Sequence, residues 1–174
     1  MLETPDYGKK YALPMGKTED LRRERAQFDG HPDLYNDILS GKAYLEAVDN
    51  GVVEEYDSVL MLSMDGAQLY QSKASDCWIY IWILVDLAPD KRYKIKNILP
   101  GGVIPGPDPP QDVDSFLFTG LAHLSALQQE GLAIWDAHHQ KRAISFLFLL
   151  LVLADAVGMA MISGSVGHHG RKGC

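Results

Sequence analysis

Residues 58–87 read SVLMLSMDGAQLYQSKASDCWIYIWILVDL, and this stretch decides the fold. It holds two apolar runs, at residues 59–64 and 77–87, with a polar segment between them. The first run is short and is followed by Asp65-Gly66, which is typical of a buried strand that closes in a turn. The second is rich in β-branched and aromatic residues, which predicts a central strand covered on both faces.

The segments that follow predict the rest of a sheet. Residues 93–98 alternate weakly and carry two lysines on one face, which indicates an edge strand. Residues 99–111, LPGGVIPGPDPPQ, contain five prolines and three glycines and indicate a loop. Asp114 or Ser115 is expected to cap a helix whose apolar stripe continues to Trp135. Residues 144–153 then read as a second buried strand, closed by Asp155.

This order of elements predicts a mixed α/β sheet. The three consecutive strands form an antiparallel meander, and the helix crosses back so that the fourth strand lies parallel to the first. Residues 1–57 are polar with short helical patterns, which indicates a helical lead-in packed on the domain that residues 58–174 form.

Length and composition restrict the class of protein. The chain has 174 residues, 47% hydrophobic and 22% charged, which is enough for one hydrophobic core and excludes a wholly disordered chain. The net charge of -7 argues against nucleic-acid binding through bulk charge, but not against carboxylates gathered around a metal ion.

Features of the sequence also bear on the compartment. Two distant cysteines and a polar N-terminus indicate a protein of a reducing compartment that is not secreted. The apolar run at residues 144–154 falls short of the about 20 residues that a spanning helix needs, so we expect no membrane association.

Two predicted strands are each followed by an aspartate, Asp65 and Asp155. If these strands are parallel neighbours, both carboxylates lie at one edge of the sheet, where they could bind Mg²⁺ together with waters and substrate phosphates. The alternative is that each Asp simply starts a turn. Asp86 also follows a strand, but its surroundings indicate ordinary turn chemistry.

Three further groups have two interpretations each. Trp78, Tyr80 and Trp82 could stack on bases, but their apolar surroundings favour packing in the core. A basic cluster could contact phosphates or face solvent on an edge strand; its members are Lys91, Arg92, Lys94 and Lys96. The C-terminal tail offers an incomplete set of zinc ligands, or a glycine-rich stretch with exposed histidines; the candidate ligands are His168, His169 and Cys174.

Several of these motifs together resemble a known family. They are DLYNDILSGKAYLEAV at residues 33–48, LSMDGAQLYQSKASDCWIYIWILVDLAPDKRYKIKNILPGGVIPGP at 62–107, DSFLFTGLAHLSALQQEGLAIWDA at 114–137 and ADAVGMAMISGSVGHHGRKGC at 154–174. In this order they resemble CACTA-type (En/Spm-like) DNA transposases of the kind common in mushroom-forming fungi.

The resemblance implies a ribonuclease-H-like catalytic domain of the DDE type. Such a domain cuts DNA at transposon ends and joins the 3′ hydroxyl to target DNA, with Mg²⁺ or Mn²⁺ as cofactor. Asp65 matches the first metal-binding, catalytic aspartate and Asp155 the second. The resemblance also implies transposon-end DNA as partner and a nuclear or cytoplasmic location, and it is compatible with a homo-oligomer.

The chain also departs from the family pattern. Val157 stands where relatives usually have proline, and the Gly-x-x-Gly-His-His-Gly-x-x-Gly-Cys pattern of residues 164–174 begins a Cys/His insertion, which would bind Zn²⁺. A second cysteine and a third acidic residue, which follow in relatives, are not found. We therefore expect a C-terminally truncated fragment of the catalytic core that is inactive alone. The alternative is a non-catalytic transposon-derived remnant or interaction module.

Overall fold

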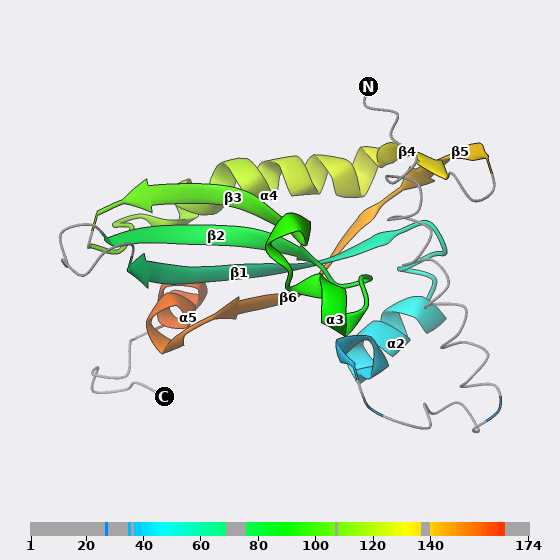
Figure 1. Cartoon of the computed structure of the whole chain (residues 1–174), viewed down its shortest axis with the longest axis horizontal. Coiled ribbons are helices and arrows are strands. Elements are labelled where there is room, and N and C mark those ends of the chain that lie inside the picture. The colour runs from blue at the N-terminus through cyan, green and yellow to red at the C-terminus, as the bar shows by residue number, and fades with distance from the viewer. Residues whose placement is uncertain are drawn as a thin grey trace.

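The computed structural model describes Gln27, Tyr35 and residues 37–68, 76–106, 108–136 and 140–165 (Figure 1). These residues form a mixed α/β structure. It consists of a four-stranded sheet of order β3-β2-β1-β6, a hairpin of β4 and β5, and four α-helices. The α/β class predicted from the sequence is confirmed.

The elements have the following bounds. The four-stranded sheet contains β1 (Ser58–Gln68), β2 (Asp76–Leu84), β3 (Ile98–Pro105) and β6 (Leu147–Ala154). The hairpin contains β4 (Leu132–Asp136) and β5 (Lys141–Ser145). The helices are α2 (Lys42–Asp49), α3 (Pro89–Arg92), α4 (Val113–Glu130) and α5 (Ala156–Ser163), and two 3₁₀ turns are η1 (Ile38–Ser40) and η3 (Ile95–Asn97).

The pairing of the large sheet follows the predicted topology. β1 pairs antiparallel with β2, and β2 pairs antiparallel with β3. After α4 and the hairpin the chain returns to the sheet, and β6 pairs parallel with β1 on its other side. The arrowheads of β1 and β6 point the same way in Figure 1.

Two hydrophobic clusters cover opposite faces of this sheet, because side chains alternate along each strand. On one face α2 and η1 pack on the ends of β1 and β2; the buried residues there include Leu39, Tyr44, Val48, Val59, Met61 and Ile83. On the other face α4 and α5 pack on the strands; the residues there include Leu62, Met64, Trp78, Tyr80, Leu117 and Met161. Residues just before the sheet therefore contribute directly to its core.

The predictions for residues 93–105 are wrong. Residues 93–97 form a turn that contains η3 instead of an edge strand, and residues 99–105 belong to β3 instead of a loop. Gly106 and residues 108–111 lie outside helices and strands, as predicted. β3 lies at the edge of the sheet, where a residue without an N–H group is tolerated. The register also shifts opposite Tyr80 and Ile81, which gives the strand a local bulge.

The glycines of β3 make room for Tyr80 of β2. A Cβ atom on Gly101 would lie 1.9 Å from the Tyr80 ring, and one on Gly102 would lie 2.5 Å from it. On α4, a Cβ on Gly120 would lie 2.6 Å from the Tyr80 hydroxyl, and the Phe116 ring packs edge-on at 5.1 Å between centroids. Tyr80 and Trp78 are buried, so their role is packing in the core.

The later elements also differ from the prediction. Helix α4 is capped by Asp112, whose side chain accepts a hydrogen bond from Ser115 N at 3.1 Å, and not by Asp114 or Ser115. The helix ends at Gly131, which has a positive φ of 74°, and Trp135 lies in β4. The predicted strand at residues 144–153 is divided into the end of β5 and most of β6.

The apolar run at residues 144–154 thus belongs to strands and the residue between them. Within the part of the chain that the structure describes, no helix is long and apolar enough to cross a membrane.

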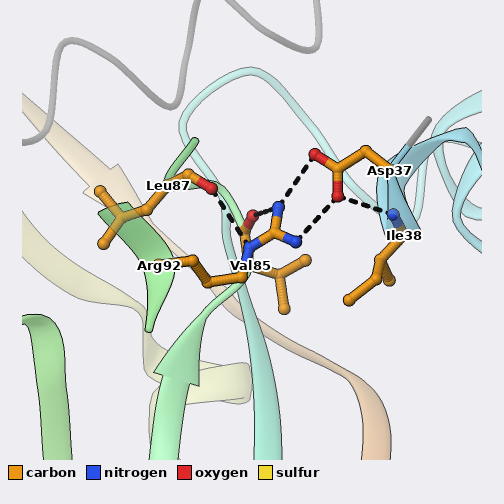
Figure 2. A network of polar contacts seen from close by, with 5 residues as sticks. All are labelled: Asp37, Ile38, Val85, Leu87 and Arg92. Carbon is orange, nitrogen blue, oxygen red and sulfur yellow. Dashed lines mark hydrogen bonds and ion pairs between the residues drawn. The ribbon is translucent and has the colours of Figure 1, made fainter. Parts of the chain in front are cut away.

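A buried ion pair connects α3 to the segment before α2. The Arg92 guanidinium contacts both carboxylate oxygens of Asp37, at 2.8 Å from Nη1 and 3.0 Å from Nη2 (Figure 2). The side chains of Arg92 and Asp37 are only 2% and 3% exposed. Arg92 also donates to the carbonyl oxygens of Val85 and Leu87, and Asp37 accepts from Ile38 N. Three chain segments therefore meet at one guanidinium group, namely α3, residues 37–38 and residues 85–87.

Asp86 lies in the turn after β2, as predicted, but its side chain is buried. The Oδ2 atom of its carboxyl group accepts a hydrogen bond from Val59 N at 2.7 Å, and the residue is 5% exposed. Burial raises the pKa of Asp86 to about 7, although the Val59 N–H and the charge of Arg92 act in the opposite direction. Asp86 thereby joins the end of β2 to the start of β1.

We predict that Arg92→Met strongly destabilises the fold, because the Asp37 carboxylate stays buried without its guanidinium partner. The expected loss in free energy of unfolding is about 3–5 kcal/mol, measured by urea denaturation. The double variant Arg92→Met with Asp37→Asn should lose less, since no charge is then left buried. As a control, Lys42→Met breaks the exposed 3.5 Å ion pair with Glu46 and should change stability little. Equal losses in the single variant and the control would contradict this role.

We predict that Asp86 causes the free energy of unfolding to fall as the pH rises from about 4 to 7. The folded state keeps the Asp86 proton up to about pH 7, whereas the unfolded chain loses it near pH 4. Its stabilising contribution is complete below about pH 4 and is lost as the pH rises through 7. Asp86→Asn should remove a slope of up to about 1.4 kcal/mol per pH unit from urea unfolding measured between pH 4.5 and 7.

A matched control for Asp86 is Asp112→Asn. The hydrogen bonds from Ser115 lower the pKa of Asp112, so this group titrates below the pH range of the measurement. Replacing Asp112 should leave the dependence of the free energy of unfolding on pH as it is in the wild type. If wild type and Asp86→Asn showed the same slope, the assigned protonation of Asp86 would be wrong.

Candidate functional site

The candidate site lies where β1 and β6 run side by side toward α5 (Figure 1). Asp65 is exposed and belongs to β1, which continues to Gln68, so the expectation that Asp65 follows the end of its strand is wrong. It stands opposite Ile79 of β2. By alternation along β1, its side chain lies on the sheet face of Met61 and not on that of the buried Met64. The residues of β1 before Asp65 pair with β2 on one side and with β6 on the other. This pairing holds Asp65 at a defined position.

Asp155 follows directly after the last residue of β6, as predicted. Its backbone is still extended, with φ -67° and ψ 176°, and its side chain caps α5. The Oδ1 atom accepts a hydrogen bond from Gly158 N at 2.7 Å. Asp155 is exposed to solvent. This cap fixes the carboxylate at the point where the chain leaves the sheet for the helix.

The parallel register brings the two aspartates to the same edge of the sheet. Met64 of β1 pairs with Ala154 of β6, so the next residue on each strand is an aspartate. Neighbouring strands lie about 4.8 Å apart, so the two aspartates occupy adjacent backbone positions at this edge. In the described part of the chain, Asp65 and the Oδ2 atom of Asp155 form no hydrogen bond or ion pair. These oxygens are therefore available as ligands.

The donor set fits a hard divalent cation. Mg²⁺ is commonly bound through one or two carboxylates, with waters and substrate phosphates as its other ligands. Two like charges on adjacent strands would also repel each other unless a cation shared them. Among the residues that the structure describes, no group of three or more His, Cys, Asp or Glu side chains could hold a metal ion. The pair formed by Asp65 and Asp155 would thus leave most coordination positions to water or substrate.

Gly158 is a site residue that the sequence analysis missed. A Cβ atom there would lie 3.0 Å from Ala154 Cβ and 3.2 Å from Asp155 Oδ1, so glycine lets the first turn of α5 sit against β6. A signal for this residue was present in the sequence. An aspartate before an apolar run is typical of a helix N-cap, and its side chain commonly accepts a hydrogen bond from the backbone N–H of the third residue after it, which here is glycine.

The other candidate residues do not join this edge. Asp86 lies beside Val59, at the opposite end of β1 from Asp65. Of the basic cluster, Arg92 is buried, while three side chains are exposed, those of Lys91, Lys94 and Lys96. The candidate zinc ligands lie outside the described residues, and so zinc binding stays a prediction for His168, His169 and Cys174.

Comparison with protein-family models, with curated proteins and with solved structures finds no match to this chain. A function must therefore be inferred from the geometry of the sheet edge and from the sequence motifs.

We predict that the two possible replacements of Asp155 differ in their effect on stability. Asp155→Ala removes the cap of α5 and should lower the free energy of unfolding by about 1 kcal/mol. Asp155→Asn keeps an oxygen that accepts from Gly158 N and should change stability by a few tenths of a kcal/mol at most. Thermal or urea unfolding of the two variants measures the difference. Equal destabilisation by both would show that the charge of Asp155, and not its cap, stabilises α5.

Proposed function

We propose that this chain forms the core of a metal-dependent domain for cutting and joining DNA strands, with Asp65 and Asp155 as its metal ligands. The observation that carries this proposal is the pairing of Met64 with Ala154, which places the two aspartates on adjacent parallel strands. The sequence resemblance to CACTA-type DDE transposases assigns the same two residues to metal binding. Two independent lines of inference therefore lead to the same pair of carboxylates.

The topology supports a ribonuclease-H-like fold for this domain. Three antiparallel strands are followed by a helix and by a strand parallel to the first, in the order β3-β2-β1-β6. This is the arrangement that the resemblance implies, with one acidic residue on the first strand and one after the strand beside it. The hairpin of β4 and β5 is an addition between α4 and β6 that the sequence analysis did not predict.

The roles of the two aspartates follow from their positions. Asp65, which is held by the paired part of β1, supplies a carboxylate with no other partner in the described chain. Asp155 uses one oxygen for the cap of α5 and keeps the other for a ligand. A bound Mg²⁺ or Mn²⁺ would activate an attacking oxygen and stabilise the negative charge of the leaving oxygen at a phosphate.

Metal binding and strand cleavage are separate expectations for this chain. With two carboxylates, and no group of three candidate ligands among the described residues, we expect the 174-residue chain to bind the cation without cutting DNA. Magnesium-dependent nicking above the level of an Asp65→Asn, Asp155→Asn double variant would contradict this expectation.

The proposal predicts binding of Mn²⁺ at the edge where β1 and β6 meet. In a titration followed by NMR, the paramagnetic ion should broaden the backbone amide signals of residues 64–66 and 154–158 first. Asp65→Asn and Asp155→Asn should each weaken binding about ten-fold or more, because each removes one of the two charged ligands. Excess Mg²⁺ should reverse the broadening by competition.

Asp112→Asn is the matched control for this titration, since Asp112 also caps a helix but belongs to neither β1, β6 nor α5. It should bind Mn²⁺ as the wild type does. If the amides of residues 64–66 and 154–158 were unaffected at millimolar Mn²⁺, or if Asp65→Asn bound as tightly as the wild type, the metal assignment would fail.

A further inference from the structure

Three exposed lysines lie close together on the turn between β2 and β3, which α3 and η3 form. They are Lys91, Lys94 and Lys96, and the apolar side chains of Tyr93 and Ile95 lie between them, 54% and 91% exposed. We call residues 91–96 the lysine turn. In Figure 1 the turn leaves the end of β2 through α3, at the end of the sheet away from α5.

The lysine turn is held rigidly from inside. Arg92 is buried and makes the paired contact with Asp37, together with hydrogen bonds to two carbonyl oxygens of the chain after β2 (Figure 2). Asn97 is also buried, and its Nδ2 atom donates to the Lys91 carbonyl at 2.8 Å. Backbone bonds from Lys94 N to Lys91 O and from Asn97 N to Lys94 O close the turn. The side chains of Arg92 and Asn97 are therefore buried, whereas the three lysine side chains remain exposed to solvent.

The turn is a positive area on an acidic protein. The described residues include six exposed basic side chains, namely Lys42, Lys91, Lys94, Lys96, Lys141 and Arg142, and half of them lie in the turn. Lys42 forms an ion pair with Glu46, and Lys141 lies over the Tyr56 ring. The three lysines of the turn form no ion pair within the described chain, and their only acidic neighbour in sequence is Asp90. Their charges are thus available to an external anion.

We propose that the lysine turn binds the phosphate backbone of duplex DNA, with Lys91, Lys94 and Lys96 as contacts to phosphates. This inference rests on the proposed function, because DNA is the substrate assigned there. Contacts from lysine to phosphate position a duplex without reading its sequence, and a rigid turn loses little freedom when it binds. Tyr93 and Ile95 would lie against the sugars between the phosphates.

The position of the turn is compatible with a duplex that also reaches the two aspartates. The turn follows the end of β2, where Leu84 pairs with Leu60 of β1, and Asp65 lies five residues further along β1. The stretch of β1 from Leu60 to Asp65 is roughly 17 Å long at about 3.4 Å per residue. A duplex rises about 3.4 Å per base pair, so this stretch corresponds to about five base pairs, or half a helical turn of DNA.

Charge favours DNA over an anionic bilayer as the partner. The exposed apolar residues within the turn are Tyr93 and Ile95, which present a small area for insertion into lipid. The three lysines, in contrast, match the dense negative charge of a duplex, from which they release condensed counterions. Lysine-dependent binding to anionic vesicles is therefore the competing outcome of the test.

The test measures binding of a fluorescent 20-base-pair duplex to the 174-residue chain by anisotropy, from 25 to 200 mM NaCl in EDTA. The triple variant Lys91→Gln, Lys94→Gln, Lys96→Gln should bind at least ten-fold more weakly at 50 mM NaCl. Its plot of log K against log salt should be shallower by about 2–3, because each lost phosphate contact contributes about 0.9 to the slope. Circular dichroism confirms that the variant is folded.

The control variant Lys42→Gln, Lys141→Gln, Arg142→Gln removes the same charge from other exposed positions. It should keep most of the wild-type affinity and slope. Equal losses in both triple variants, no binding by the wild type at 25 mM NaCl, or lysine-dependent binding to phosphatidylserine vesicles without binding to DNA would each overturn the inference.

The same measurements separate this inference from the proposed function. The assay contains EDTA, so it measures DNA binding by the lysine turn with no metal ion at the aspartates. Lysine-dependent DNA binding without Mn²⁺ binding at the aspartates would support the lysine turn and remove the proposed metal site. Mn²⁺ binding without lysine-dependent DNA binding would do the reverse.

Discussion

The parallel pairing of β1 with β6 is the constraint on which the rest of the structure depends. A parallel neighbour cannot be reached by a tight turn, so the chain must cross over one face of the sheet. Here α4 makes most of that crossing and buries Leu117 and Leu124 as it does so. The same pairing orients both strands toward one edge, where Asp65 and Asp155 follow paired residues. Core and candidate site therefore arise from a single topological choice.

Elements with a consistent apolar or amphipathic pattern were predictable from the sequence. An element whose composition is unusual for its place in the fold was not. β1, β2 and β6 are apolar runs, and α4 carries an amphipathic stripe, so local composition was sufficient. β3 has the composition of a loop, with two prolines and two glycines in eight residues. It is a strand because an edge position tolerates proline and because Tyr80 needs the space that Gly101 and Gly102 leave. Both reasons are tertiary, and neither can be read from the segment alone.

The candidate site was predictable for a similar reason, and its surroundings were not. An acidic residue directly after a short apolar run is a local pattern, and the topology that joins two such runs follows from the order of elements. Arg92 shows the limit of this reasoning. Within a run of basic residues it resembles its neighbours, but its partner Asp37 lies 55 residues earlier in the chain. Only the folded arrangement distinguishes the buried guanidinium from the exposed lysines beside it.

Because Arg92 is buried and the lysines beside it are exposed, the same short segment both stabilises the fold and presents positive charge at the surface. A guanidinium can satisfy two carboxylate oxygens and two carbonyl groups at once, which suits it for burial, whereas lysines stay hydrated on flexible stems. The ion pair that fixes α3 to the segment before α2 thus also fixes the backbone from which the lysines project. The net charge of -7 does not describe this surface, because three of the acidic groups, Asp37, Asp86 and Asp136, are buried. An anionic partner contacts the local arrangement of charges on the surface. That arrangement depends on which charged side chains are buried in the core.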